Sequence, residues 1–304
     1  MCKSVTFIAK AVLIIAVLFL VDQGLSPVFQ RYFFKAPYGD IHDINYVMSE
    51  SNEKLIAMGS SKARHHFVSY LLQDSLNMSA FNAGMDGKGI YYHYVVLTGI
   101  LERYKPEIII LDLSGKDLTV SSDFGFDALN QLLPYYGKVH SLDTLITMQG
   151  FSEVLKVQSR LFRYNSKLAQ LIGSYTIPYK IDKGYNPLNG NWKGGLEELE
   201  RIDYQIDSTK LTYLQRFIDV ARSNNVELIV TISPVFRIQT SEQGVYEELT
   251  KILKSNRIPH LMLNQSPEFL AHPEWFADPA HLNGTGARVF TNKVAQFILH
   301  HQTK

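Results

Sequence analysis

Short apolar segments alternate with helical segments along most of the chain, and this alternation restricts the fold more than any other feature of the sequence. The strongest apolar segment is "EIIILDL" at 107–113, and helical periodicity is clearest in "IYYHYVVLTGILERYK" at 90–105. Such alternation favours a parallel sheet covered on both faces, because a helix usually crosses over between two parallel strands. We therefore expect an α/β fold, with a parallel sheet between two layers of helices.

The remaining segments follow the same order. Strands are expected at 54–58, 78–84, 226–235 and 258–263, and helices at 62–76, 209–225 and 283–301. Residues 121–207 interrupt this order with helical stretches and a loop rich in Gly and Asn, "KGYNPLNGNWKGG". Ligands of open parallel sheets bind outside the carboxyl ends of the strands. We interpret the interruption as a helical insertion that could lid that edge.

An apolar run of 17 residues extends from Val5 to Val21, broken only by Thr6 and Lys10. This length is at the short end of the range for a transmembrane helix. Lys10 lies near one end of the run, where its stem can bring the charge to the headgroups. The run contains no amphipathic pattern of the kind that a buried core helix shows, so we expect it to span a membrane.

Positive charge before the run, from Lys3, Lys10 and the terminal amine, favours a cytoplasmic N-terminus, although Arg31 and Lys35 beyond the run oppose it. No small-residue cleavage pattern follows the run, which favours an uncleaved anchor over a removed signal peptide. We expect a single-pass protein of the cytoplasmic membrane, with its main domain on the extracytoplasmic side. Three parts are expected: a cytoplasmic tip and transmembrane signal-anchor at 1–22, a connector at 23–50, and the α/β domain at 51–304.

Composition excludes several functional classes. Lys and Arg number 30 against 29 Asp and Glu, so no nucleic-acid partner is expected from the net charge of +1. The single cysteine, Cys2, allows neither an internal disulfide nor a CxxC redox or metal motif. The ten histidines form no His-Glu-x-x-His motif. We therefore expect neither a metal nor another cofactor.

Candidate chemical groups follow three expected strands and precede the last expected helix. The first strand ends in Gly59-Ser60-Ser61, the second runs into "NAGMDG" at 82–87, and the third runs into "SGKD" at 114–117. Acyl transfer through a serine needs a base within hydrogen-bond reach, an acid that orients this base, and donors for the oxyanion. Asp278 and His281, on one short turn, can supply the acid and the base together. Taken singly, each signal is weak, because Gly-Ser-Ser also caps helices and glycines are common in turns.

In this order, the blocks from about Leu55 to Phe290 resemble the SGNH/GDSL hydrolase family. The resemblance implies Ser61 as the nucleophile, with Ser60 where the family has an aspartate. "DPAHLN" is similar to the last block of the family, which implies His281 as the base and Asp278 as its orienting acid. The implied fold is the flavodoxin-like parallel sheet of the SGNH hydrolases.

The same resemblance implies an oxyanion hole. The backbone N–H groups of Ser61 and Gly87 would be two of its donors. The third block departs from the family, because Lys116 stands where the family has an asparagine. A lysine could donate to the oxyanion there as a third group.

The Gly-Ser-Ser variant and the membrane anchor together look like the envelope branch of this family, which includes proteins for O-acetylation or D-alanylation of surface polymers. This resemblance implies a serine esterase or O-acyltransferase acting on small acyl groups, such as acetyl, of cell-envelope glycans or glycolipids. An acyl-donating membrane protein would be a further partner. The alternative is a catalytically inactive protein of the same fold that binds polysaccharide, which Lys116 and Ser60 favour.

Aromatic and histidine side chains allow further interpretations. Tyr185 and Trp192 are candidates for substrate contact, because amphipathic rings stack on sugars. They could form a wall with Tyr135, Tyr136 and Tyr164, or all five could pack the small core of the insertion. The adjacent residues 65–66, both histidine, are expected on a solvated flank of the helix after the first strand.

Overall fold

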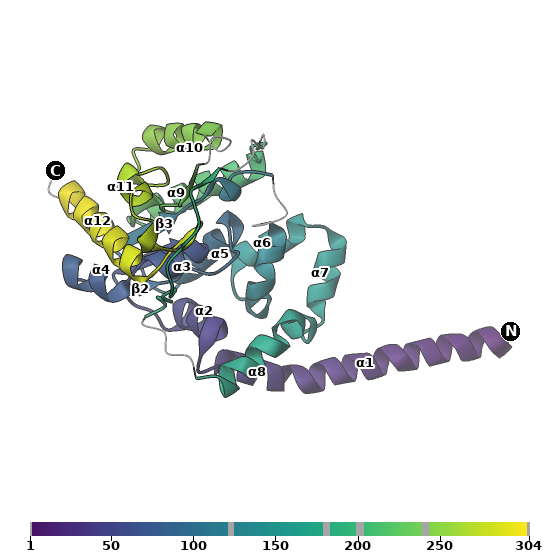
Figure 1. Ribbon diagram of the computed structural model, residues 1–304. Coiled ribbons are helices and arrows are strands. Elements are labelled where there is room, and N and C mark those ends of the chain that lie inside the picture. The colour runs from purple at the N-terminus through teal and green to yellow at the C-terminus, as the bar shows by residue number, and fades with distance from the viewer. Residues whose placement is uncertain (1, 121–124, 179–182, 199–203, 239–242, 303–304) are drawn as a thin grey trace. The chain divides into compact units, whose positions relative to one another are not determined.

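The computed structural model describes residues 2–120, 125–178, 183–198, 204–238 and 243–302 (Figure 1). The chain divides into two compact units, and each is described by itself. The helical unit contains Met1–Asn45 and Leu129–Tyr179, and the sheet unit contains Tyr46–Ala128 and Lys180–Lys304.

A five-stranded parallel sheet forms the centre of the sheet unit. Its strands are β1 (Leu55–Gly59), β2 (Ala80–Asn82), β3 (Ile108–Asp112), β5 (Glu227–Ile232) and β7 (His260–Met262). Their order across the sheet is β2-β1-β3-β5-β7, and every neighbouring pair is parallel. Counted in chain order, this is the flavodoxin-like order 2-1-3-4-5, so the expected fold class is confirmed. Every residue of β1 and β3 is buried, as continuous apolar strands covered on both faces require.

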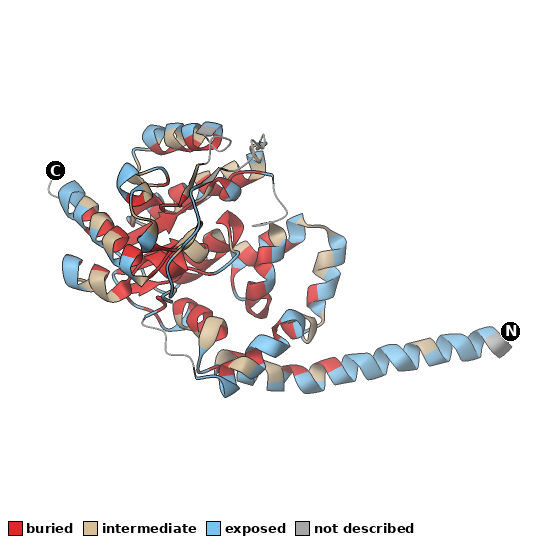
Figure 2. Cartoon of the chain, viewed as in Figure 1, coloured by how far each residue is buried: buried red, intermediate tan, exposed pale blue. Residues whose placement is uncertain are grey.

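Helices cover the sheet, and their buried sides face it (Figure 2). α5 packs with α9, and α12 packs with α3 and α4. The helices of this unit are α3 (Ser61–His66), α4 (Ser69–Leu76), α5 (Ile90–Leu101), α9 (Ser208–Ser223), α10 (Gln243–Ser255), α11 (Pro267–Leu270) and α12 (Gly284–Gln302). α10 did not emerge from the sequence pattern. The helix expected at 62–76 is divided into α3 and α4, because Phe67 and Val68 have extended backbone conformations.

Shorter elements complete this unit. Two of them form a small antiparallel pair, β8 (Phe276–Asp278) with β9 (His281–Leu282), and two form a parallel pair, β4 (Glu197–Glu198) with β6 (Arg237–Ile238). The 3-10 helices are η1 (Gly115–Asp117), η2 (Phe126–Tyr135), which continues into the helical unit, and η5 (Pro273–Trp275). The carboxyl ends of β1 and β3 lie side by side, because Gly59 pairs with Asp112 in the register.

The helical unit is built on a single long helix, α1 (Cys2–Phe34). Its other helices are α2 (Gly39–Ser49), which ends in the sheet unit, α6 (His140–Met148), α7 (Phe151–Gln158), η3 (Phe162–Lys167) and α8 (Leu168–Thr176). The segment Ser4–Phe34 contains an 18-residue window with a mean hydropathy of 2.6 and is long and apolar enough to cross a membrane. Residues 23–34, assigned to a connector from the sequence, continue this helix.

The core of the helical unit is aromatic. The ring of Phe33, at the end of α1, lies against the rings of Tyr135 and Tyr164, with centroid distances of 6.4 and 5.6 Å. Asn45 joins this cluster, because its Nδ2 donates to the carbonyl oxygen of Phe33 at 2.5 Å and its Oδ1 accepts from the hydroxyl of Tyr135 at 2.5 Å. The insertion therefore packs its own core with the last turns of α1.

Candidate active site

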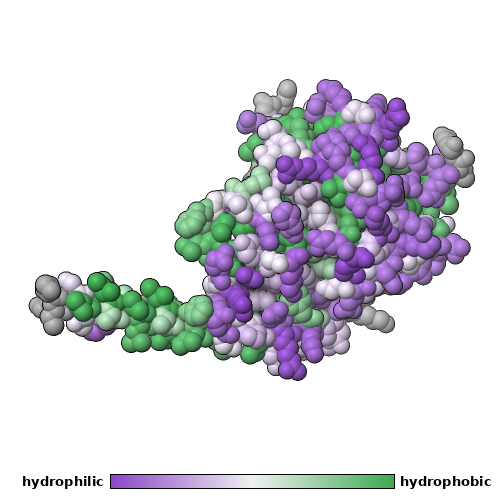
Figure 3. Space-filling view, turned by 180° about the vertical axis from the view of Figure 1, so that it is seen from behind, coloured by the Kyte–Doolittle hydropathy of each residue, from purple (hydrophilic) through white to green (hydrophobic). Residues whose placement is uncertain are grey.

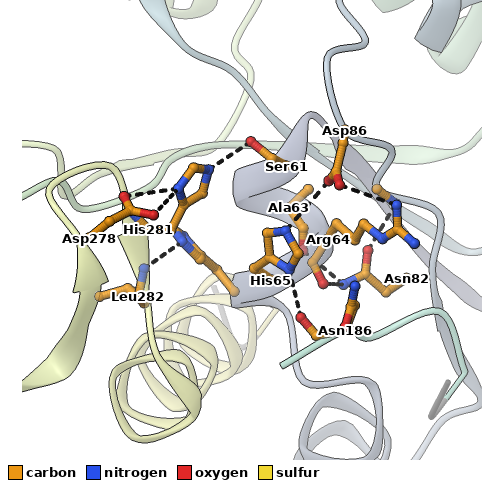
Figure 4. Close-up of polar contacts among 12 residues, drawn as sticks. Ser61, Ala63, Arg64, His65, Asn82, Asp86, Asn186, Asp278, His281 and Leu282 are labelled. Carbon is orange, nitrogen blue, oxygen red and sulfur yellow. Dashed lines mark hydrogen bonds and ion pairs between the residues drawn. The ribbon is translucent and has the colours of Figure 1, made fainter. Parts of the chain in front are cut away.

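Ser61 is the first residue of α3 and follows directly on the turn that ends β1. Ser60 is the N-cap residue, has an extended backbone, and makes no side-chain capping hydrogen bond. The hydroxyl of Ser61 lies 2.8 Å from Nε2 of His281, which is 220 residues further along the chain (Figure 4). The Gly-Ser-Ser corner thus brings a serine hydroxyl to an imidazole at the carboxyl edge of the sheet.

The imidazole of His281 is held from its other side by Asp278. Nδ1 of His281 lies 3.0 Å from Oδ1 and 2.9 Å from Oδ2 of this carboxylate (Figure 4). Oδ1 also accepts from the backbone N–H groups of Ala280 at 2.7 Å and His281 at 3.0 Å. Partial burial raises the pKa of Asp278, but the hydrogen bonds from His281 and Ala280 outweigh burial and hold the pKa below its ordinary value. The carboxylate is therefore ionised at neutral pH and accepts the Nδ1–H of His281.

The expectation that residues 65–66 lie on a solvated flank is wrong, because both histidines are buried against the site. His66 is fully buried, and its Nε2 accepts the backbone N–H of Leu282 at 2.9 Å. Burial lowers the pKa of His66 well below its ordinary value, so the ring is neutral and can accept this bond. The alternation of strands and helices in the sequence could not reveal the burial of these two histidines. They are buried by β9 and α12, which lie more than 200 residues away in the sequence.

His65 lies beside the imidazole of His281. The two rings meet edge to face, with their centroids 5.7 Å apart. Nδ1 of His65 lies 2.6 Å from the carbonyl oxygen of Asn186, and its Nε2 lies 3.5 Å from Oδ1 of Asp86. Burial lowers the pKa of His65, which favours the neutral ring with its proton on Nδ1. The same Asp86 accepts from the buried guanidinium of Arg64 at 3.3 Å.

The segment after β2 approaches α3 closely. Only glycine fits at position 84, because a Cβ there would lie 2.3 Å from the backbone nitrogen of Arg64. Residues 85–88 form a turn in which the N–H of Lys88 donates to the carbonyl oxygen of Met85 at 3.2 Å. Gly87 is the third residue of this turn, is exposed, and has a φ of +68°, a conformation that glycine adopts without strain. The turn is tied to the end of β1, because the N–H of Met85 donates to the carbonyl oxygen of Gly59 at 2.9 Å.

Lys116 lies in η1, directly after β3, and its side chain is exposed. Its carbonyl oxygen accepts from Nζ of Lys210 at 3.1 Å. The sequence interpretation missed the buried carboxyl of Asp112 at the end of β3. This carboxyl accepts from the hydroxyls of Thr231 at 2.7 Å and Ser233 at 2.9 Å. Burial nevertheless raises the pKa of Asp112 to about 7.

Tyr185 and Trp192 occupy different environments in the sheet unit. Tyr185 is buried but lines a pocket of about 760 Å³. The other lining residues are Tyr70, residues 187–191, residues 283–285 and Arg288. Trp192 packs against the core around Phe276, and its indole N–H donates to the carbonyl oxygen of Gly195 at 3.2 Å.

The five aromatic residues considered from the sequence do not gather in one unit. Tyr135 and Tyr164 are buried in the aromatic core of the helical unit, as the packing alternative expected, whereas Tyr185 and Trp192 belong to the sheet unit. Among the residues that the structure describes, no group of three or more His, Cys, Asp or Glu side chains could hold a metal ion.

No protein-family model matches the sequence, and no curated protein matches it either. Among solved structures, the chain is similar to the psychrotrophic esterase EstA from Pseudoalteromonas sp., with 13% identity, 82% of this chain and 98% of that chain covered, and a TM-score of 0.43. It is also similar to the lipase/acylhydrolase from Enterococcus faecalis, with 12% identity, coverage of 80% and 94%, and a TM-score of 0.43. A lipolytic G-D-S-L family protein from Desulfitobacterium hafniense has 11% identity, coverage of 81% and 99%, and a TM-score of 0.44. The roles of individual residues therefore rest on the geometry of the site.

Proposed function

We propose that this protein is a serine esterase or O-acyltransferase of the SGNH type, with Ser61, His281 and Asp278 as its catalytic residues. One observation carries the proposal: the Ser61 hydroxyl lies 2.8 Å from Nε2 of His281, whose Nδ1 lies 2.9 Å from the carboxylate of Asp278. A nucleophile, a base and an orienting acid in hydrogen-bond contact are what acyl transfer through serine requires.

The reaction begins when Asp278 holds the proton of His281 on Nδ1, which leaves the lone pair of Nε2 directed at Ser61. Oγ of Ser61 attacks the ester carbonyl while its proton passes to Nε2. The tetrahedral intermediate collapses to an acyl-enzyme, and the imidazolium gives its proton to the departing alcohol. Water then releases the acyl group in an esterase, or a sugar hydroxyl accepts it in a transferase.

The oxyanion needs donors preorganised near Ser61. The backbone N–H of Ser61 is suited to this role, because the first N–H groups of a helix have no acceptor within the helix. The N–H of Gly87 is the second proposed donor, since the turn that contains it is tied to β1 and directly follows Gly84, which packs closely against α3. Lys116, at the neighbouring strand end, is the third.

We propose that α1 anchors the protein in the cytoplasmic membrane as a single pass, with the catalytic unit on the extracytoplasmic side. The length and hydropathy of the helix support the anchor. In that compartment the substrates would be small acyl esters, such as acetyl esters, of envelope glycans or glycolipids, supplied by an acyl-donating membrane protein in the transferase case. The polar pocket at Tyr185 would suit a ligand rich in hydroxyls, and Trp192 is the second proposed contact.

A second candidate function is polysaccharide binding without catalysis. It is favoured by Lys116, an exposed lysine where the SGNH/GDSL family has an asparagine. It is also favoured by Ser60, which stands in place of that family's aspartate. In this case the pocket at Tyr185 would bind glycan, and the serine would stay unreactive.

The test is ester hydrolysis by the purified full-length chain in detergent, with p-nitrophenyl acetate and with an acetylated glycan. We expect Ser61→Ala and His281→Ala to lose at least about 100-fold in activity, while the neighbouring control Ser60→Ala keeps it. Acetyl recovered on an added acceptor glycan identifies a transferase, and acetate alone identifies an esterase. Glycan binding by a folded wild-type protein that turns over neither ester supports the second candidate and contradicts the first.

A further inference from the structure

Outside α1, exposed large apolar side chains concentrate in two parts of the helical unit, one around α7 and one in α8. Phe151 is 80% exposed, Leu155 60% and Met148 51%. The second part, in and just after α8, contains Leu168, Ile172, Tyr175 and Ile177. Soluble proteins rarely leave contiguous apolar surface uncovered, so such a surface indicates a partner or a membrane.

The buried carboxylate of Asp22 fixes where the end of α7 lies along the axis of α1. Asp22 is the first residue after the apolar run, and its carboxylate accepts from the hydroxyl of Ser159 at 2.6 Å. It also accepts from the backbone N–H groups of Arg160 at 3.1 Å and Leu161 at 2.9 Å. Residues 159–161 directly follow α7, so the C-terminal end of α7 lies at the level where the apolar run ends. Figure 1 shows α7 leading away from α1 at this level rather than running along it.

α7 has the two faces of an interfacial helix. Phe151 and Leu155 are four residues apart and therefore share one face, while Val157 is buried on the other side. Two exposed basic residues flank this face: Lys156, whose Nζ also pairs with the carboxylate of Glu153 at 2.6 Å, and Arg160, just after α7. Basic side chains at the edge of an apolar face can reach lipid headgroups. Hydrophobic side chains lie along the N-terminal helix and again on the part that projects beside it (Figure 3).

The exposed apolar residues of α8 lie at a different position along the axis of α1. The hydroxyl of Tyr175, near the end of α8, donates to the carbonyl oxygen of Tyr32 at 2.9 Å. Tyr32 is ten residues beyond Asp22, which is about 15 Å further along the helix axis. A bilayer crossed by the apolar run would therefore meet α7 before this end of α8.

We propose that α7 lies in the membrane interface, with its Phe151 and Leu155, and with Met148 at the end of α6, dipping into the boundary between headgroups and acyl chains. This inference rests on the proposed function in one respect, the anchoring of α1 across a membrane. We take lipid to cover this apolar face, because the face begins at the level where α1 leaves the hydrocarbon core of the bilayer. The helical unit then contacts the bilayer through two elements, α1 and α7, and cannot swing freely about the end of the anchor.

The test measures the depth of fluorescent labels in the full chain, reconstituted into phosphatidylcholine and phosphatidylglycerol vesicles. Cys2→Ser removes the only native thiol, and single cysteines are then introduced as Phe151→Cys or Leu155→Cys and labelled with NBD. Ile14→Cys reports on the anchor itself. Leu299→Cys, at an exposed leucine of α12, is the matched control.

We expect lipids with a nitroxide near the headgroup to quench the labels at 151 and 155 by at least about twofold, and to leave the label at 299 unchanged. Lipids with a deep nitroxide should quench the label at 14. Labels at 151 and 155 that stay in water while position 14 is quenched overturn the inference and leave the anchor intact. Blue-shifted but unquenched labels at 151 and 155 mean that a second copy of the chain covers the face, which also overturns it. No quenching at position 14 means that the anchor itself has failed.

Discussion

The buried side chain of His66 accepts a hydrogen bond from the backbone N–H of Leu282 at 2.9 Å. Leu282 follows His281 in β9, and His66 ends the helix that begins with Ser61. This bond therefore joins the element that carries the proposed nucleophile to the element that carries the proposed base. Because burial holds His66 neutral, the bond persists at physiological pH.

We predict that His66→Leu slows the reaction of Ser61 with a fluorophosphonate by about tenfold, because a small displacement of His281 disrupts proton transfer. The unpaired N–H of Leu282 should also lower the free energy of unfolding by about 1–3 kcal/mol. His66→Gln offers an amide oxygen in place of Nε2 and should recover most of the labelling rate. Labelling rates are compared on samples with equal folded fractions. A His66→Leu variant that labels at the wild-type rate would show that the bond does not position the base.

Asn82 should be a major determinant of stability near the site. It is almost fully buried, and its Nδ2 donates to the carbonyl oxygens of Ala63 at 2.7 Å and Phe67 at 2.8 Å. Its Oδ1 accepts the N–H of Gly84 at 2.9 Å. We predict that Asn82→Ala lowers the free energy of unfolding by about 2–4 kcal/mol, because these backbone groups lose their partner in the interior. Denaturant unfolding measures this loss, and the exposed control Asn52→Ala should stay within about 0.5 kcal/mol of wild type. Equal effects of the two substitutions would contradict this role.

Asp112 should make stability depend on pH. Burial raises its pKa to about 7 in the folded state, while the unfolded chain has the ordinary value near 4. The folded state therefore binds this proton more tightly than the unfolded state does. The stabilisation of the fold by proton binding is fully present below about pH 4. This effect is lost as pH rises towards 7, with a slope of up to about 1.4 kcal/mol per pH unit. The buried carboxyl of Asp117, with its pKa raised to about 6 by burial, acts in the same direction.

The corresponding variant is Asp112→Asn, which keeps an oxygen acceptor for Thr231 and Ser233 but cannot ionise. The free energy of unfolding of the variant, minus that of wild type, should be larger at pH 8 than at pH 5. Thermal unfolding in detergent at the two pH values measures the difference. A difference between variant and wild type that is the same at both pH values would mean that Asp112 does not titrate in this range.

Local patterns were sufficient to predict the sheet, and the family resemblance was needed to predict the proposed site residues. Each expected strand forms at its place, because continuous apolar runs such as Ile108–Leu111 are stable only when both faces are covered. Ser61, Asp278 and His281 come together because parallel strands bring their carboxyl ends to one edge, where the loops that follow them also meet. The resemblance to the SGNH/GDSL family, added to this order of blocks along the chain, predicted that these three residues would be neighbours.

Contacts between distant segments explain what the sequence left open. α3 ends before Phe67, and the N–H of Val68 donates to the hydroxyl of Thr291 at 3.0 Å, a partner 223 residues away. Asp22 likewise finds Ser159 across 137 residues. Helical periodicity carries no information about such partners. Consequently neither the burial of His65 and His66 nor the continuation of α1 into the helical unit could be predicted.

Whether Ser61 is an activated nucleophile can be measured by phosphonylation of the full-length protein with a fluorophosphonate, followed by mass spectrometry of the peptide that contains Ser61. We predict one phosphonate per chain, attached to Ser61, with labelling lost in Ser61→Ala and reduced at least about 100-fold in His281→Ala. Ser60→Ala should label like wild type. A folded wild-type protein that stays unlabelled, or that labels equally fast without His281, would contradict the claim that Ser61 is an activated nucleophile.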